Sequence, residues 1–195
     1  MSRKSIVFTV KSASAAREGR KTQTRRVIVP QPPGGYESPT EESAGLWFWH
    51  KSYGDIEHWP DDGLACAYGS PGDVLSIREA WAVDRQYDGL PPSLIPPEAA
   101  IWYPADDEKP EWAGRTRSGR GMPLWAVRMA VRIINVRPDH LQSISQDDAL
   151  AEGVHGGTTA YAGVWDRINA CRGYTFESNP WVWVIDFILN SRHDR

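Results

Sequence analysis

Residues 125–136 read WAVRMAVRIINV and alternate between two sets of side chains. The apolar set is Val127, Met129, Val131 and Ile133, and the mixed set is Arg128, Ala130, Arg132 and Ile134. Side chains of an extended chain point alternately to opposite faces of a sheet. The pattern therefore predicts one long strand with a mainly apolar face.

Shorter β-branched or aromatic runs predict further strands on both sides of this one. They are 5–10 (SIVFTV), 27–29 (VIV), 74–81 (VLSIREAW), 101–103 (IWY) and 181–188 (WVWVIDFI). Regular structure after the 27–29 strand is expected to end at the prolines and glycines of residues 30–35.

Three short helices are predicted, over residues 13–18, 145–153 and 164–171. The second has the clearest boundaries, because Ser145 opens a capping-box-like run, SQDD, and Gly153 provides a stop. Five or six short strands with few helices predict an α+β fold, a small mixed β-barrel with helices covering its ends.

The chain has 195 residues, which fits a single domain over 1–195. Two stretches rich in proline and glycine, 30–70 and 84–121, are expected to be long loops or insertions. The aromatic side chains of Trp47, Phe48, Trp49 and Trp59 indicate that part of the first stretch packs onto the protein.

Several classes of protein are excluded by what the sequence lacks. There is no run of about 18 apolar residues for a membrane span, and the N-terminus has no apolar region of a secretory signal. Cys66 and Cys171 are too far apart for a zinc-binding pair or a disulfide framework, so a cytoplasmic setting is expected. The motifs of P-loops, dinucleotide-binding folds, serine hydrolases and zinc deaminases are absent, and neither a metal nor a cofactor is expected.

Charge is distributed unevenly along the chain. The net charge is −3, yet residues 1–28 carry a net +7 and residues 115–138 a net +6. If these segments meet in the fold, they form a surface that attracts anions. The alternative is two separate, solvated basic faces.

The densest polar cluster is Gly19 to Arg26, GRKTQTRR. In an extended run Thr22 and Thr24 share one face, and the long side chain of Lys21 can fold back over Thr24. A neutral lysine amine beside a hydroxyl is a known nucleophile-and-base pair. The structural alternative is an exposed basic turn.

A second candidate is Glu152, at the predicted C-terminal end of the 145–153 helix. The helix dipole disfavours an acid at that end, and an acid placed against its local preference suggests a function. The structural alternative is a solvent-facing glutamate on an acidic helix.

Three motif blocks together resemble the ASCH domain family. They are EGRKTQTRR at 18–26, GDVL at 72–75 and ISQDDALAEG at 144–153, and the ending NPWVWVI at 179–185 is similar to longer phage and prophage members. The resemblance covers about half of the chain and implies a PUA-like β-barrel related to RNA-binding modules. The stretches 30–70 and 84–121 would be insertions relative to short family members.

One bacterial branch of the family hydrolyses N4-acetylcytidine with a lysine, a threonine and a glutamate. Residue by residue, the resemblance implies Lys21 as proton acceptor, Thr24 as nucleophile and Glu152 as proton donor to the leaving amine. We further expect substrate binding by six residues near these motifs: Arg20, Arg25, Arg26, Arg78, Glu79 and Trp81. Trp81 or Trp125 would stack on a pyrimidine, although most tryptophans are expected to be core residues.

Two other functions fit the same residues. A non-catalytic RNA- or DNA-binding module would use the basic segments to hold phosphates, and a ribonuclease would use the same cleft. The first interpretation expects an acylated cytidine or related nucleoside as ligand, whereas the other two expect a nucleic acid. None of the three involves a membrane, and the sequence does not indicate an oligomeric state.

Overall fold

Strand β9 (Met129–His140) is the long strand that the alternation predicts, although it begins and ends a few residues later than expected. A computed structural model describes residues 4–43, 45–51, 57–106 and 108–190. Of these, 4–21, 74–132 and 189–190 form one compact unit, and 22–73 and 133–188 form the other. Strand β9 contributes to both, and each unit is described by itself.

The first unit is built on β1 (Ser5–Val7), β6 (Val74–Arg78) and the start of β9. Strand β1 runs parallel to β6, with Ile6 opposite Ile77, and β6 runs antiparallel to β9. Both isoleucines are buried, which explains why these short runs are β-branched.

Helix α1 (Val10–Arg17) follows β1 in the same unit. It begins earlier than the predicted 13–18 helix, because the Thr9 hydroxyl caps it by accepting a hydrogen bond from the Ser12 amide. Three alanines, at positions 13, 15 and 16, form its buried face. The amide of Lys21 then bonds back to the carbonyl of Ala15, which places Lys21 at the bend after the helix.

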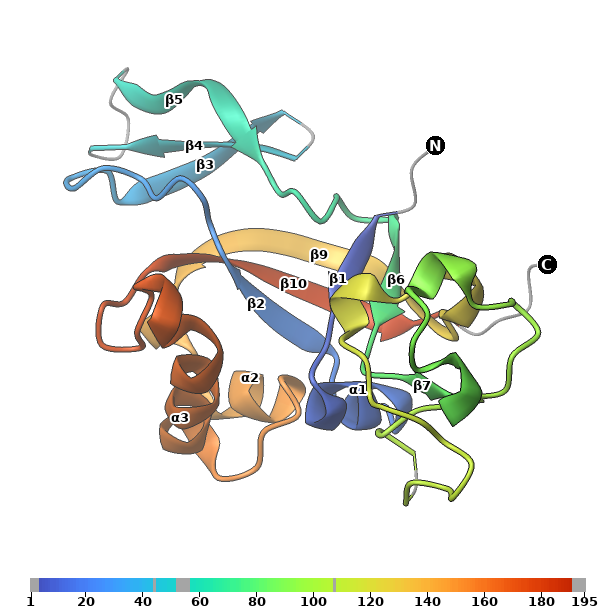
Figure 1. The fold of residues 1–195 in the computed structure, drawn as a ribbon. Coiled ribbons are helices and arrows are strands. Elements are labelled where there is room, and N and C mark those ends of the chain that lie inside the picture. The colour runs from blue at the N-terminus through green and yellow to red at the C-terminus, as the bar shows by residue number, and fades with distance from the viewer. Residues whose placement is uncertain (1–3, 44, 52–56, 107, 191–195) are drawn as a thin grey trace. The chain divides into compact units, whose positions relative to one another are not determined.

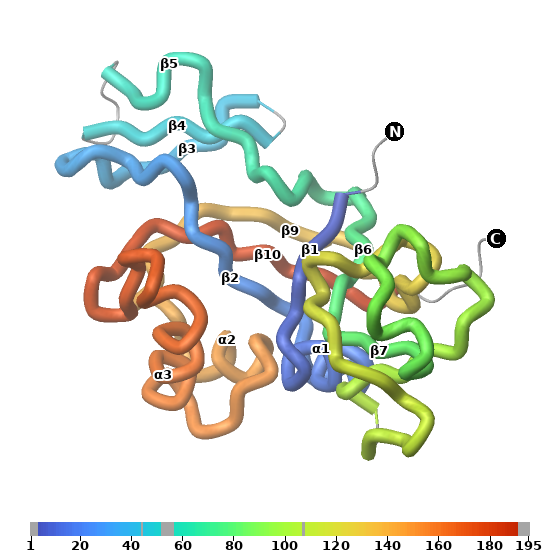
Figure 2. Tube along the Cα trace, viewed as in Figure 1, coloured from blue at the N-terminus to red at the C-terminus, as the bar shows by residue number. Residues whose placement is uncertain are grey.

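Residues 84–121 form mostly irregular structure, seen as the green to yellow-green tube in Figure 2. Its regular parts are brief 3-10 turns and β8 (Ile101–Trp102), which pairs antiparallel with β7 (Ala82–Val83) just before the segment. The segment nevertheless packs down, because its Ile95 is buried in a core cluster with the flanking residues Trp81, Val83, Met122 and Ala126. The stretch is therefore a packed loop rather than an open one.

In the second unit β10 (Trp181–Leu189) lies between β9 and the edge strand β2 (Gln23–Val27), as Figure 1 shows. Strand β2 begins before the predicted 27–29 strand and pairs antiparallel with β10, with Thr24 opposite Ile185. Helices α2 (Gln146–Ala151) and α3 (Gly157–Asn169) contact each other and share a core cluster with Val182 and Val184.

A three-stranded sheet in the second unit occupies most of the stretch expected to be a loop. Its strands are β3 (Ser38–Ser43), β4 (Leu46–His50) and β5 (His58–Ala65), paired antiparallel in that order. Trp49 of β4 is fully buried against the rings of Trp181 and Trp183. The expectation of an irregular stretch at 30–70 was wrong, whereas the expectation that its aromatic residues pack down is confirmed.

The α+β class is confirmed, but the predicted closed barrel is not found. Strands β1 and β2 each have a partner on one side only, and within the described residues no pairing closes the sheet. The predicted single domain stays a prediction. None of the helices in the described part of the chain has the length and apolarity that a bilayer-spanning helix needs.

Candidate functional site

Glu152 lies at the C-terminal cap of α2, as predicted, and its side chain is buried rather than exposed to solvent. Its Oε1 accepts a hydrogen bond of 2.6 Å from the backbone N–H of Arg25. Three residues before Arg25, the amide of Thr22 donates a hydrogen bond of 2.8 Å to the carbonyl of Ala151. These two bonds fix the end of α2 against the outer edge of β2, so the carboxylate lies beside the residue that follows Thr24.

Tyr161 of α3 supports the same carboxylate. Its hydroxyl donates to Glu152 Oε1 at 3.2 Å, and its ring is part of the core cluster beneath. Burial, reinforced by the negative charge of Glu152, raises the pKa of Tyr161 well above its usual value. The phenol therefore stays protonated and acts as a fixed hydrogen-bond donor.

Arg25 supplies the positive charge next to Glu152. Its guanidinium is fully buried and lies 3.8 Å from Glu152 Oε1 and 3.1 Å from Asp148 Oδ2. It also donates to the side-chain oxygen of Gln23, whose amide nitrogen donates to Asp148 and Asp186. The second unit therefore contains a connected polar network under β2, in which Arg25 lies beside two carboxylates and Gln23 links it to the carboxylate of Asp186.

Thr24 is buried, with 4% of its surface exposed. Because side chains alternate along β2, its hydroxyl points to the face opposite Gln23 and Arg25. The carboxylate of Glu152 meets the strand at its edge, at the backbone N–H of Arg25. The structure therefore brings Glu152 to the backbone next to Thr24, although 128 positions separate the two residues in the sequence.

Lys21 precedes Thr24 by three positions and is likewise buried, with 4% of its surface exposed. The amide of Lys21 is fixed by the carbonyl of Ala15, and its Nζ lies 5.4 Å from the centre of the Phe8 ring. The alternative of an exposed basic turn is excluded for both Lys21 and Thr24.

The six expected substrate-binding residues have different environments. Arg25, Glu79 and Trp81 are buried, Arg26 and Arg78 are half-buried, and Arg20 is exposed. Arg20 pairs with Glu18 at the helix end. Arg26 lies 5.8 Å from the Tyr68 ring centre. Arg78 donates to the Arg120 carbonyl.

Trp81 packs edge to face on Trp125, in a core position. No part of its ring is exposed for stacking in this structure, and a role in substrate binding stays a prediction.

Glu79 is part of a second charged network, inside the first unit. Its two oxygens accept hydrogen bonds from Arg128 at 2.8 and 3.1 Å, and Arg128 also donates to Asp106. Burial alone would lower the pKa of Arg128, but the bonds to the two carboxylates raise it above its usual range. Asp106 also pairs with Arg17 at 3.0 Å. One aspartate therefore binds an arginine from each basic segment, Arg17 from residues 1–28 and Arg128 from residues 115–138.

Sequence reasoning missed Tyr161 and the network role of Asp148. Tyr161 lies before the predicted start of the third helix, and α3 in fact begins at Gly157. Asp148 was expected only as a capping residue, which it also is, since its carboxylate accepts from the Ser145 amide at 3.0 Å. Across the described residues, no group of three or more His, Cys, Asp or Glu side chains is placed to hold a metal ion.

The network predicts an acid-sensitive contribution to stability from Asp148. Burial acts to raise the pKa of Asp148, but hydrogen bonds from Ser145 and Gln23 and the charge of Arg25 leave it below its usual value. A folded-state pKa below the unfolded one means that the unfolded chain binds more protons as pH falls. The stabilisation is thus complete at neutral pH and is lost below about pH 4.

Urea unfolding between about pH 3 and pH 7 measures this effect. The free energy of unfolding of Asp148→Asn should depend less on pH in the acid range than that of the wild type. Asp147→Asn, at the exposed neighbouring position in the first turn of α2, is the matched control and should keep the wild-type slope. Equal slopes for wild type and Asp148→Asn would contradict the assignment.

Comparisons with known proteins do not assign the chain to a family. No family model matches it, and no curated protein matches it. The chain is similar to the crystal structure of a protein from Enterococcus faecalis that is described as family DUF984. The alignment covers 100% of this chain and 87% of the Enterococcus chain, with a TM-score of 0.45 and 14% sequence identity. A similarity at this level carries no argument about function.

Proposed function

We propose that this protein is an amidohydrolase that removes an acyl group from the N4 amine of cytidine-type nucleosides. The proposal includes an ASCH-type, PUA-like relationship, which rests on the three motif blocks of the sequence. The observation that supports it best is the hydrogen bond from the Arg25 amide to Glu152, because it holds the proposed acid at the backbone of the residue that follows the proposed nucleophile.

The first half of the reaction transfers the acyl group to Thr24. The Thr24 hydroxyl attacks the amide carbonyl, its proton passes to the neutral amine of Lys21, and protonated Glu152 gives a proton to the departing N4 amine. Cytidine leaves, and an ester remains on Thr24. Backbone N–H groups or arginines near the Lys21 bend would stabilise the oxyanion.

The second half restores the enzyme. Water attacks the ester carbonyl, Glu152 takes a proton from this water, and the Lys21 ammonium returns its proton to the Thr24 oxygen. The products are a carboxylic acid and the starting protein, so protons and bonds balance. Tyr161 contributes by keeping the Glu152 carboxyl in place through both halves.

A nucleic-acid-binding module or a ribonuclease is supported by the basic segments of the sequence. Several arginines of those segments, however, are already neutralised within the protein. Arg17 pairs with Asp106, Arg25 with Asp148, and Arg128 with Glu79. Pairs of this kind leave less positive charge for phosphate contacts than the sequence suggests, which favours the enzyme.

Purified protein should therefore release cytidine from N4-acetylcytidine and from close N4-acyl analogues. The shift in ultraviolet absorbance on deacylation measures the rate, and a labelled RNA in a parallel reaction measures strand cleavage and binding. Protein that is inert on all N4-acylated cytosine compounds but binds RNA would favour the module. Cleaved strands would favour the ribonuclease.

A further inference from the structure

A cavity in the first unit has the composition of an anion site. It has a volume of about 330 Å³ and is lined by Pro92, Gly121 and the run from Arg115 to Ser118. Two arginines and two hydroxyl groups therefore surround one opening. All the residues that line this cavity belong to the first unit, whereas Thr24 and Glu152 belong to the second unit.

Arg117 is unusual among the buried arginines. Only 8% of its surface is exposed, and its guanidinium donates to the carbonyls of Leu90 at 3.0 Å and Tyr87 at 2.7 Å. Its Nε is buried without a hydrogen-bond partner. Arg25 and Arg128, in contrast, each pair with two carboxylates. A buried cation whose hydrogen bonds go only to neutral carbonyls is costly unless an anion comes close to it.

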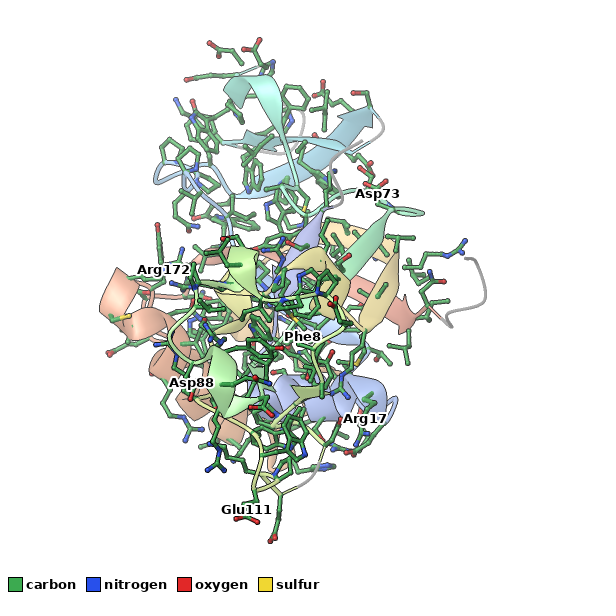
Figure 3. All side chains as sticks on the ribbon, turned by 45° about the vertical axis from the view of Figure 1, so that its right-hand side comes forward. Phe8, Arg17, Asp73, Asp88, Glu111 and Arg172 are labelled. Carbon is green, nitrogen blue, oxygen red and sulfur yellow. The ribbon has the colours of Figure 1, made fainter. Side chains whose placement is uncertain are left out.

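The neighbouring charges increase that cost. Burial and the positive charge of Arg115 lower the pKa of Arg117, and the negative charge of Asp88 offsets this only in part. The Asp88 carboxylate, labelled in Figure 3, already accepts the Arg115 amide with both oxygens, at 2.8 and 3.0 Å. In the described structure the exposed guanidinium of Arg115 makes no hydrogen bond or ion pair.

We propose that this cavity binds the phosphate group of an organic phosphate, held between the guanidinium groups of Arg115 and Arg117. Guanidinium forks and hydroxyl donors match the several oxygens of a phosphate better than the two of a carboxylate. The hydroxyls of Thr116 and Ser118 supply further donors at the rim. The volume exceeds that of a bare phosphate and leaves room for the group esterified to it.

Titration calorimetry at fixed ionic strength tests this assignment, with inorganic phosphate, cytidine monophosphate and a short oligocytidylate as probes. Arg115→Gln should weaken each detectable affinity about tenfold or more, because it removes a charge-assisted contact. Arg132→Gln removes one exposed arginine of the same unit away from the cavity and should change affinity by less than about twofold.

The probes also identify the source of the phosphate. Binding of the monophosphate at least as tight as that of the oligonucleotide indicates a small phosphorylated ligand, and binding of the oligonucleotide alone indicates a nucleic-acid backbone. Arg117→Lys keeps the charge but loses the planar fork, so it should also weaken binding while preserving the thermal unfolding midpoint within a few degrees. Absence of binding to all three probes, or equal losses in Arg115→Gln and Arg132→Gln, would overturn the site. Because the readout is binding, it is independent of the proposed hydrolysis.

Discussion

Thr24→Ala and Lys21→Ala should each lower the rate of N4-acetylcytidine hydrolysis by about a thousandfold or more, because each removes one member of a nucleophile-and-base pair. The double variant should be little slower than either single one, since residues that act as a unit lose their effect together. Lys21→Arg should fail as well, because a guanidinium stays protonated and cannot accept the hydroxyl proton. Initial rates of cytidine release measure all four variants.

Burial makes a stability control necessary for these variants. Lys21 and Thr24 are each 4% exposed, so truncating either side chain also removes buried contacts. Thr24→Ser keeps the hydroxyl and should retain most of the rate, which separates loss of the nucleophile from loss of packing. An inactive Thr24→Ser with a normal thermal midpoint, or an active Thr24→Ala, would contradict the role of Thr24.

Trp49→Ala should destabilise the protein by about 3–5 kcal/mol, the usual cost of removing a buried tryptophan side chain. The Trp49 ring is fully buried and lies 5.8 to 6.1 Å from the rings of Trp59, Trp181 and Trp183. Its loss would leave a cavity between the three-stranded sheet and β10. Urea unfolding followed by tryptophan fluorescence and circular dichroism measures the change.

Trp112→Ala is the matched control for that experiment. Trp112 is 39% exposed, so its truncation should cost less than about 1 kcal/mol. A small effect at both positions would show that the 38–65 sheet contributes little to the stability of its unit. A large effect at Trp112 alone would mean that burial does not explain the loss in the free energy of unfolding.

Local signals predicted those parts of the fold that local interactions determine. The helix predicted over 145–153 is correct in place, with its regular part at Gln146–Ala151, because a capping box begins it and a glycine with φ +77° follows its end. The closing strand at 181–188 is correct within one residue. Its continuous apolar run reflects burial on both faces, since Trp183 packs on Trp49 and Val184 packs under the helices.

Long-range contacts determine the parts that were missed. Strand β3, SPTEES, is polar on both faces and has no alternation, so only its pairing with β4 makes it a strand. The candidate site also depends on contacts between residues that are distant in the sequence. The position of Glu152 at a helix end was predictable, but its bond to the Arg25 amide joins residues 127 positions apart. Tyr161 completes the arrangement from a helix turn that lies before the predicted helix start at residue 164.

Rapid quenching of the wild-type protein during its first turnover of N4-acetylcytidine, followed by peptide mass spectrometry, tests the proposed chemistry most directly. We predict release of cytidine together with an acetyl ester on the peptide that contains Thr24, and neither product with Thr24→Ala. Absence of cytidine release by the wild type, or release that persists at the wild-type rate in Thr24→Ala, would contradict it.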